Sequence, residues 1–547
     1  MAMADGMDRR TFLGSGMAAG IAGAIGPLPL GASRPRKPAA FAPPEFELEE
    51  ATIADLQAKM ESGEYTARSL AEAYLARIEA LDGNGPALRA MLETNPDALE
   101  IADGLDAERT AGGVRGPLHG IPILLKDNVE TADRMETTAG SLALLGARPT
   151  RDAFVAGRLR EAGAVILGKA NLSEWANFRS TSSSSGWSAR GGQAKNPYAL
   201  DRTPCGSSSG SGTAVAANLC VVAVGTETDG SIVCPSAANS LVGIKPTLGL
   251  VSRAGIVPIA HSQDTAGPMA RTVADAAILL GTMAGADPTD PATAESRGHS
   301  HENYSRFLDP RGLEGARIGI VREKLFGYSE ETDRIAESAI EALRESGAVL
   351  ADPVTLPHAG EYDDSEYEVL LYEFKADLNA YLAGRPGAAV RTLADLIQFN
   401  QERRDEEMPF FGQEIFVQAE EKGPLSEAAY VEALEKNHRL SRAEGIDHVM
   451  DEHRLDALFA PTTSPPWTID LVNGDHGLGG CSTPAAVAGY PHVTVPAGYT
   501  FGLPVGVSFF GRAWSEPVLI RLAYAFEQAM RARRPPKFVA TAELGTP

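Results

Sequence analysis

Short apolar runs that end in a charged or polar residue are the feature that most limits how this chain can fold. GIPILLKDN at residues 120–128 is such a run, and EAGAVILGKAN at residues 161–171 joins a helix end to a buried strand. Ahead of both, Ile53, Leu56 and Met60 recur at the spacing of an amphipathic helix. Helical and strand-like segments therefore alternate, and this alternation predicts an α/β fold.

The alternation continues around two serine-rich segments in the middle of the chain. Residues 211–218 predict a helix of small residues, residues 221–224 a strand, and residues 225–231 a turn that follows this strand. Residues 355–450 are rich in Glu, Leu, Tyr and Ala without strand-like runs, and we interpret them as an inserted helical layer. Short strands return in LDALFAPT, HVTVPAG and LPVGVSFFG, so the sheet is completed late in the chain.

The first 45 residues have the layout of an export signal and a tether. Arg9 and Arg10 precede an apolar stretch rich in Ala and Gly, which resembles a twin-arginine signal peptide. The stretch is shorter than the roughly 20 apolar residues that span a bilayer, so no stable membrane anchor is expected; the alternative is a disordered basic tail. We expect a signal peptide at residues 1–32, a proline-rich tether at 33–45 and a single domain at 46–535, exported by the twin-arginine machinery to the periplasm or the medium.

Composition and charge narrow the class of protein. With 547 residues, of which 44% are hydrophobic and 22% charged, the chain can bury a large core as a soluble globular protein. Its formal charge of −23 repels polyanions, so nucleic acid is not an expected partner.

The cysteines and histidines do not form a recognisable metal pattern. The four cysteines include no CxxC pair, which argues against a zinc ribbon, although Cys220 and Cys234 could form a disulfide. His299 and His301 lie in a polar stretch that we interpret as a surface loop. Neither a metal nor a cofactor is expected.

Two clusters of serine and glycine are candidate sites for a nucleophile: CGSSSGSGTA at residues 205–214 and ETDGSIVCPS at residues 227–236. Such runs are usually flexible linkers, but linkers rarely lead directly into a helix and a buried strand. GSSSG in the first cluster also fits the GxSxG pattern, which would make Ser208 the nucleophile of an α/β-hydrolase with a later Asp and His. That motif follows an apolar strand, whereas ALDRTPC precedes this one.

Lys126 is the candidate base, because it ends the apolar run IPILL and is expected at the edge of the core. Buried lysines are rare in proteins. The alternative is a lysine whose stem is buried while its ammonium group reaches water.

The segments GIPILLKDN, CGSSSGS and GTETDGSI followed by GIKPT, in this order, resemble the amidase signature hydrolases. The resemblance runs from about Thr52 to Met530 and implies a central mixed β-sheet covered by helices on both faces. It also implies that Ser231 is the nucleophile, that Ser207 is a bridging serine that usually follows a cis peptide bond, and that Lys126 is the base.

The resemblance further implies an oxyanion hole in the turn before the nucleophile. Its donors would be the backbone amides of Thr228, Asp229, Gly230 and Ser231. Asp229 stands where the commonest family pattern has glycine, so its side chain is expected to point away from the oxyanion.

The proposed base must be neutral near pH 7, although the reference pKa of lysine is about 10.4. Burial away from water can lower a lysine pKa by about 3 to 5 units, which is enough to make Lys126 neutral near pH 7. Neutral Lys126 would then take a proton from Ser207, and Ser207 would take one from Ser231, which attacks the amide carbon to form an acyl-enzyme.

The residues after the proposed nucleophile bear on the substrate. Family members that bind a free carboxylate often carry an arginine there, whereas Ile232, Val233 and Cys234 follow Ser231 in this chain. We therefore expect a neutral carboxamide that is hydrolysed to a carboxylic acid and ammonia or an amine. The stretches GWSARGGQAKNPY and STPAAVAGYPHVTVPAG resemble the peptide amidase branch, which removes ammonia from C-terminal peptide amides.

Other substrates and one other function remain as alternatives. Aryl amides, anilides and carbamates are alternative substrates, and an exported binding protein that has lost its activity is an alternative of another class. Trp187, Trp467, Tyr490 and Phe510 could line an apolar cleft, although aromatic side chains are more often core than cleft.

Overall fold

A mixed sheet of 11 strands is the centre of the part of the chain that this computed structural model describes, residues 41 and 43–544. The strand order is β1-β3-β2-β6-β8-β7-β12-β13-β11-β9-β10. β3, β2 and β6 are parallel, β11, β9 and β10 are parallel, and the strands between these two groups pair antiparallel. The bounds are Met91–Thr94 (β1), Pro122–Lys126 (β2), Val165–Ala170 (β3), Val222–Glu227 (β6), Val242–Lys245 (β7), Thr265–Ala270 (β8), Arg317–Val321 (β9), Val349–Val354 (β10), Ala457–Pro461 (β11), His492–Thr500 (β12) and Leu503–Phe510 (β13).

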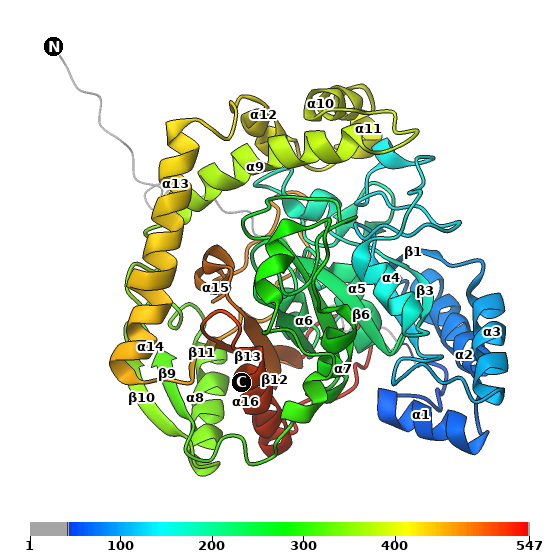
Figure 1. Cartoon of the computed structure of the whole chain (residues 1–547), viewed down its shortest axis with the longest axis horizontal. Helices are drawn as coiled ribbons and strands as arrows, with labels where there is room; N and C mark the ends of the chain where they lie inside the picture. The colour runs from blue at the N-terminus through cyan, green and yellow to red at the C-terminus, as the bar shows by residue number, and fades with distance from the viewer. Residues whose placement is uncertain (1–40, 42, 545–547) are drawn as a thin grey trace, which may run out of the picture. The chain divides into compact units, whose positions relative to one another are not determined.

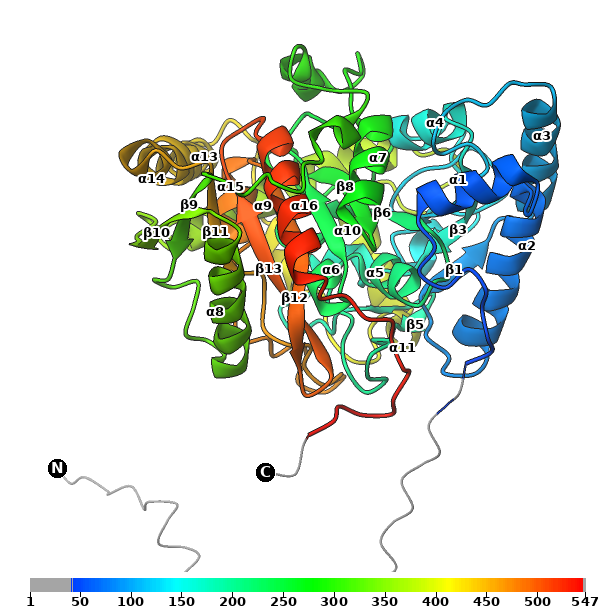
Figure 2. The ribbon, with the colours of Figure 1, turned by 90° about the horizontal axis from the view of Figure 1, so that it is seen from below.

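Helices flank the sheet on both faces, which confirms the expected α/β architecture (Figure 1; Figure 2). α16 packs on α7 and on α8, and all three helices pack on the central strands. α5 and α6 pack on each other and on β6, β12 and β13. The bounds are Ile53–Ser62 (α1), Ala67–Ile78 (α2), Ala98–Thr110 (α3), Phe154–Glu161 (α4), Ser209–Ala216 (α5), Val233–Ala238 (α6), Val273–Met283 (α7), Glu330–Glu345 (α8), Asp363–Ala383 (α9), Leu393–Glu402 (α10), Arg404–Glu407 (α11), Glu414–Glu420 (α12), Ala428–His438 (α13), Asp447–His453 (α14), Thr483–Ala488 (α15) and Glu516–Met530 (α16).

The first predicted helix shows how local sequence sets an element. Thr52 and Asp55 form a capping box at the start of α1, and Gly63 ends it with a φ of +78°, a conformation that glycine adopts without a steric penalty. The helix buries Ile53 and the other apolar positions of its periodic pattern. The helical spacing in the sequence therefore predicted both the element and its buried face.

The central strands are apolar because they are covered on both faces. All residues of β2 and of its parallel neighbours β3 and β6 are buried, as is typical of parallel strands between helical layers. α5 follows a loop into the same region, and its small residues are required by close packing: a Cβ at Gly210 would lie 2.3 Å from the carbonyl oxygen of Ala90. The carboxyl ends of β2 and β6 meet at one edge of the sheet, where the serine-rich loops also lie.

The segment between β10 and β11 consists of helices α9 to α14 and their connecting loops, and α9 packs against α12 and α13 (Figure 1). The expected signal peptide, residues 1–32, and the tether as far as residue 40 lie outside the described residues. Among the helices that the structure describes, none is long and apolar enough to cross a membrane.

Candidate active site

Lys126 is the last residue of β2, and its side chain has no exposed surface. Its Nζ lies 2.7 Å from Ser207 Oγ, 2.8 Å from Thr226 Oγ1 and 3.2 Å from the carbonyl oxygen of Thr226. A neutral amine has two N–H donors and one lone pair. The two oxygens of Thr226 can take both donors, which leaves the lone pair directed at the Ser207 hydroxyl.

The electrostatic surroundings of this lysine favour the neutral form. Burial lowers the pKa of Lys126 to about 7, while the carboxylates of Asp264 and Glu227 act in the opposite direction and limit the shift. A group with a pKa near the working pH is suited to accept and return a proton. The alternative of an ammonium group that reaches water is excluded, because the whole side chain is buried.

Ser207 lies between the lysine and the start of α5. The peptide bond between Gly206 and Ser207 is cis, as the resemblance implied for the bridging serine. Its neighbour Ser208 is not available as a nucleophile, because its Oγ donates to the carbonyl oxygen of Thr226 at 3.1 Å and accepts from the amide of the same residue at 3.2 Å. The GxSxG alternative is therefore wrong: this hydroxyl fastens α5 to β6.

Ser231 follows the turn that leaves β6. The carboxylate of Glu227 accepts from the amides of Ile232 at 2.6 Å and Val233 at 3.0 Å, which fixes the turn from within. The amide of Ser208 donates to the carbonyl oxygen of Ser231 at 3.2 Å and joins the two serine loops. Ser231 is largely buried, with 8% of the residue exposed.

The turn offers free donors to a developing negative charge. In the part of the chain that the structure describes, the backbone amides of Thr228, Asp229, Gly230 and Ser231 donate to no protein acceptor. Gly230 has a φ of +79°, which permits the tight turn. The side chain of Asp229 is directed to α15, where its Oδ2 accepts from Thr483 Oγ1 at 2.7 Å, and burial raises the pKa of this carboxyl group.

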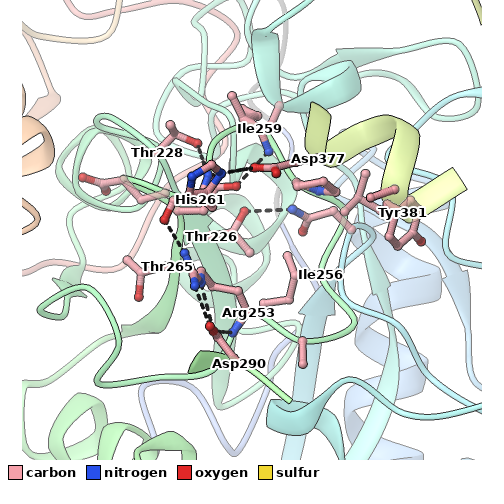
Figure 3. A pocket seen from close by; sticks show the side chains of 18 of the residues that line it. Thr226, Thr228, Arg253, Ile256, Ile259, His261, Thr265, Asp290, Asp377 and Tyr381 are labelled. Atoms are coloured by element: carbon pink, nitrogen blue, oxygen red, sulfur yellow. Dashed lines mark hydrogen bonds and ion pairs between the residues drawn. The ribbon is translucent and has the colours of Figure 1, made fainter. Parts of the chain in front are cut away.

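A cavity of about 260 Å³ approaches the site from the side of the base. Ser207 and residues 226–228 are part of its lining. Ile256, Ile259 and Tyr381 contribute apolar surface to the same cavity (Figure 3). Ser231 is not part of the described lining.

The charged groups of this cavity are paired with each other. Arg253 donates to both carboxylate oxygens of Asp290, at 2.5 and 2.9 Å, and His261 Nδ1 lies 2.8 Å from Asp377 Oδ2. Asp264 accepts from Thr228 Oγ1 at 2.6 Å, and burial raises its pKa to about 6. The cavity therefore presents no free cation to a substrate among the residues that the structure describes.

Within the described chain, none of the four aromatic residues considered for an apolar cleft lines this cavity, which agrees with the alternative that such side chains belong to the core. Trp187 packs edge-on against Phe411 with ring centroids 5.1 Å apart, and Phe510 is a buried residue of β13. Trp467 Nε1 donates to Asp475 at 3.0 Å. These rings are used in packing.

The two histidines considered as metal ligands point to different partners: His299 stacks on Trp514, and His301 Nδ1 lies 2.9 Å from an arginine nitrogen. A different group, His261, Glu373 and Asp377, brings its donor atoms within 4.8 Å of one another. These donors already have protein partners, including Tyr430 on Glu373 at 2.7 Å. The geometry gives no reason to place a metal there.

The disulfide differs from the pair considered from the sequence. Cys234 is bonded to Cys205, with Cα atoms 6.0 Å apart, while Cys220 is a free and buried thiol. The suggested Cys220–Cys234 bridge is therefore wrong. Two cysteines form a disulfide only if the fold brings them close together. The sequence feature that pointed to the observed pair is that Cys205 and Cys234 each flank one of the serine motifs.

Sequence reasoning also missed the groups that orient the relay. Thr226 holds both donors of the lysine, and Glu227 ties the turn, although both residues belong to the quoted GTETDGS motif. The sequence feature that could have identified Glu227 is the position of an acidic residue at the end of a buried, mostly apolar strand.

Comparisons with known proteins agree with this geometry. The protein-family model "Amidase" matches residues 69–520. A probable amidase of Arabidopsis thaliana is 46% identical over 90% of this chain and 93% of its own, and a putative amidase of Schizosaccharomyces pombe is 39% identical over 90% and 87%. The X-ray structure of native peptide amidase from Stenotrophomonas maltophilia superposes with a TM-score of 0.86 at 55% identity, over 90% of this chain and 99% of that one. The chain therefore belongs to the amidase signature family, and it is an amidase, a hydrolase that acts on amide bonds.

Proposed function

We propose that this amidase hydrolyses neutral carboxamides through a relay of Lys126, Ser207 and Ser231, and that C-terminal peptide amides are its substrates. The observation that carries the relay is the 2.7 Å contact between Lys126 Nζ and Ser207 Oγ in a site that holds the lysine pKa near 7. Both features are what a general base at neutral pH requires.

The reaction proceeds by two proton transfers and one acyl transfer. Neutral Lys126 accepts the proton of Ser207 while Ser207 accepts that of Ser231, and Ser231 Oγ attacks the amide carbon. The free amides of residues 228–231 stabilise the oxyanion, each contributing about 10² to 10³ in rate. The relay returns its proton to the departing nitrogen, and water then releases the carboxylic acid from the acyl-enzyme.

Two observations support a neutral acyl group. Ile232 and Val233, which follow the nucleophile, are buried and uncharged, and the guanidinium of Arg253 in the cavity is already paired with Asp290. The choice of peptide amides rests on the 55% identity to a peptide amidase. Aryl amides, anilides and carbamates are the alternative substrates.

The test compares three serine variants on one panel of peptide amides, anilides and carbamates, with release of ammonia or amine as the measurement. Ser231→Ala should lower kcat by about 10⁴-fold or more, as removal of a nucleophile does. Ser207→Ala should lower it by about 10² to 10⁴-fold. Ser208→Ala is the matched control and should remain within about tenfold of wild type.

The same panel separates the relay from the choice of substrate. Adduct formation on Ser208 with a serine-directed organophosphonate would contradict the relay. Turnover of anilides or carbamates in preference to peptide amides would reject the proposed substrate but leave the relay intact.

We also propose export by the twin-arginine machinery, which rests on Arg9 and Arg10 ahead of the apolar stretch. The disulfide between Cys205 and Cys234 supports this proposal, because such bonds persist mainly in oxidising compartments. Replacement of both arginines by lysine should leave the full-length precursor in the cytoplasm, as measured by cell fractionation. Normal export of this variant would reject the proposal.

A further inference from the structure

The disulfide connects the two segments that carry the proposed catalytic serines. Cys205 lies two positions before Ser207, and Cys234 lies three positions after Ser231. The backbone of the first segment is tightly packed: a Cβ at Gly206, between Cys205 and Ser207, would lie 2.3 Å from Ser173 Oγ.

Each of the two segments is fixed internally. On the first, Ser209 Oγ donates to the carbonyl oxygen of Cys205 at 2.7 Å. On the second, the amide of Cys234 donates to the carbonyl oxygen of Gly230 at 2.8 Å, and Glu227 holds the amides that follow the nucleophile. Each segment therefore behaves as a unit, and the distance between the serines depends on how the two units are joined.

Few polar contacts join these units. Between residues 204–209 and residues 226–239, the described hydrogen bonds include Ser208 N to the carbonyl oxygen of Ser231 at 3.2 Å and, at the far end of α6, Asn239 Nδ2 to the carbonyl oxygen of Pro204 at 2.9 Å. The other two join Ser208 Oγ to the carbonyl oxygen and the amide of Thr226, at 3.1 and 3.2 Å. A single protein hydrogen bond contributes little net stability against solvent. The disulfide is the covalent link and lies beside the reacting hydroxyls.

We propose that the Cys205–Cys234 disulfide positions the two serines for proton transfer, so that its reduction lowers turnover while the fold persists. This inference rests on the proposed relay. Proton transfer between Ser231 and Ser207 requires hydrogen-bond distance, and a misplacement of about 1 Å can cost about 10² in rate. Substrate binding depends less on this distance, so kcat falls and KM changes little.

A dithiol supplies the two electrons for the reduction. Its thiolate attacks the sulfur of Cys234, a partly exposed residue, and the Cys205 thiolate leaves and is protonated. The second thiol of the reductant then displaces Cys234, which is protonated in turn, and the reductant closes into a cyclic disulfide. The other two cysteines do not interfere. Cys220 and Cys481 are buried, and burial raises the pKa of each thiol to about 12, so they stay unreactive.

The experiment measures kcat and KM of the folded enzyme on a peptide amide before and after dithiothreitol, with iodoacetamide and mass spectrometry to count the freed thiols. We expect two new labelled sites, a fall in kcat of about 10- to 100-fold and KM within about threefold. Reoxidation with oxidised glutathione should restore kcat. The Cys220→Ala variant, which loses a thiol elsewhere, should respond as wild type does.

The double variant Cys205→Ala/Cys234→Ala should match the reduced enzyme and no longer respond to dithiothreitol. Unchanged kcat in an enzyme with both thiols labelled would overturn the inference. A fall in kcat that parallels loss of the near-ultraviolet circular dichroism signal would also overturn it, because the bond would then support only the fold. A wild-type enzyme without activity on any amide of the panel would instead reject the proposed function.

Discussion

Two buried lysines at the ends of adjacent parallel strands have different roles. Lys126 ends β2, and Lys169 lies one residue before the end of β3; neither has exposed surface. Burial lowers the pKa of Lys126 to about 7 and that of Lys169 to about 8. Lys126 faces the hydroxyl of Ser207, whereas Lys169 donates to the carbonyl oxygen of Val129 at 2.6 Å and to Thr137 at 2.7 Å.

The difference lies in what each nitrogen contacts. Lys169 fastens the loop that follows β2, and the neighbouring carboxylate of Asp127 opposes its deprotonation. Lys126 contacts the hydroxyl of Ser207, the serine that would pass the proton in the proposed relay. Burial alone therefore makes a lysine unusual, and its contacts decide whether it performs chemistry.

The largest expected effect is on turnover. Lys126→Met keeps the length of the side chain but removes the base, so kcat should fall by about 10² to 10⁴-fold, the usual contribution of general base catalysis. The measurement is steady-state hydrolysis of a peptide amide between pH 6 and 9. Near-normal turnover across this range would remove Lys126 from the mechanism.

The matched change at the other strand should act on stability. Lys169→Met removes the donor to the buried carbonyl oxygen of Val129 and to the hydroxyl of Thr137, so the free energy of unfolding should fall by about 1 to 3 kcal/mol, the cost of a buried polar group that loses its partner. Its kcat at 25 °C should stay within about threefold of wild type. Urea denaturation and steady-state kinetics together check this, and a large loss of kcat in the folded variant would erase the contrast between the lysines.

The pH dependence of the rate should follow the base. Because Lys126 acts in its neutral form and its pKa is about 7, kcat/KM should rise about tenfold per pH unit below pH 7 and level off above it. A pH profile of wild type at constant ionic strength measures this. A flat profile from pH 5 to 7 would show that no group with this pKa controls the reaction.

The pH dependence of stability tests the same lysine without substrate. Its pKa is lowered from 10.5 in the unfolded chain to about 7 in the folded protein, so between these values the unfolded chain binds more protons. The contribution of Lys126 to the free energy of unfolding therefore rises with pH from about 7 to 10.5. Lys126→Met should lose this slope in denaturation measured at several pH values, and an identical slope in wild type and variant would contradict the lowered pKa.

The smallest expected effect concerns a neighbouring carboxylate. Asp264 raises the pKa of Lys126, so Asp264→Asn should move the midpoint of the pH–rate profile down by about 0.5 to 1 unit. Asp377→Asn, in the same cavity but bonded to His261, is the control and should leave the midpoint in place. A midpoint at higher pH in Asp264→Asn would contradict the conclusion that Asp264 raises the pKa of Lys126.

Local pattern was enough to predict much of the fold. The apolar run IPILL predicted β2, and the small residues at 211–218 predicted a helix, which the structure has at Ser209–Ala216, two residues earlier. A strand or helix buried between layers must be apolar or small along its whole length. The order of three motifs was enough to name Lys126, Ser207 and Ser231, and the fold brings the first two into contact.

Contacts between residues far apart in the chain could not be predicted from local sequence patterns. Cys205 and Cys234 are 29 positions apart, and although each flanks a serine motif, the distance between the two motifs in space is not contained in the sequence. The aromatic residues considered for a cleft could not be assigned for a similar reason, since a buried ring and a ring that lines a cavity have the same sequence signature.

The sequence by itself determined the family, the α/β class of the fold and the approximate positions of several strands and helices, because these depend on periodicity and on short motifs. Only the tertiary structure decided which buried lysine meets a serine hydroxyl, which cysteines bond across the two loops and which amides stay free of protein acceptors. Those outcomes depend on distances of a few ångströms between segments far apart in the chain, and proton transfer, disulfide formation and oxyanion binding are all set by such distances.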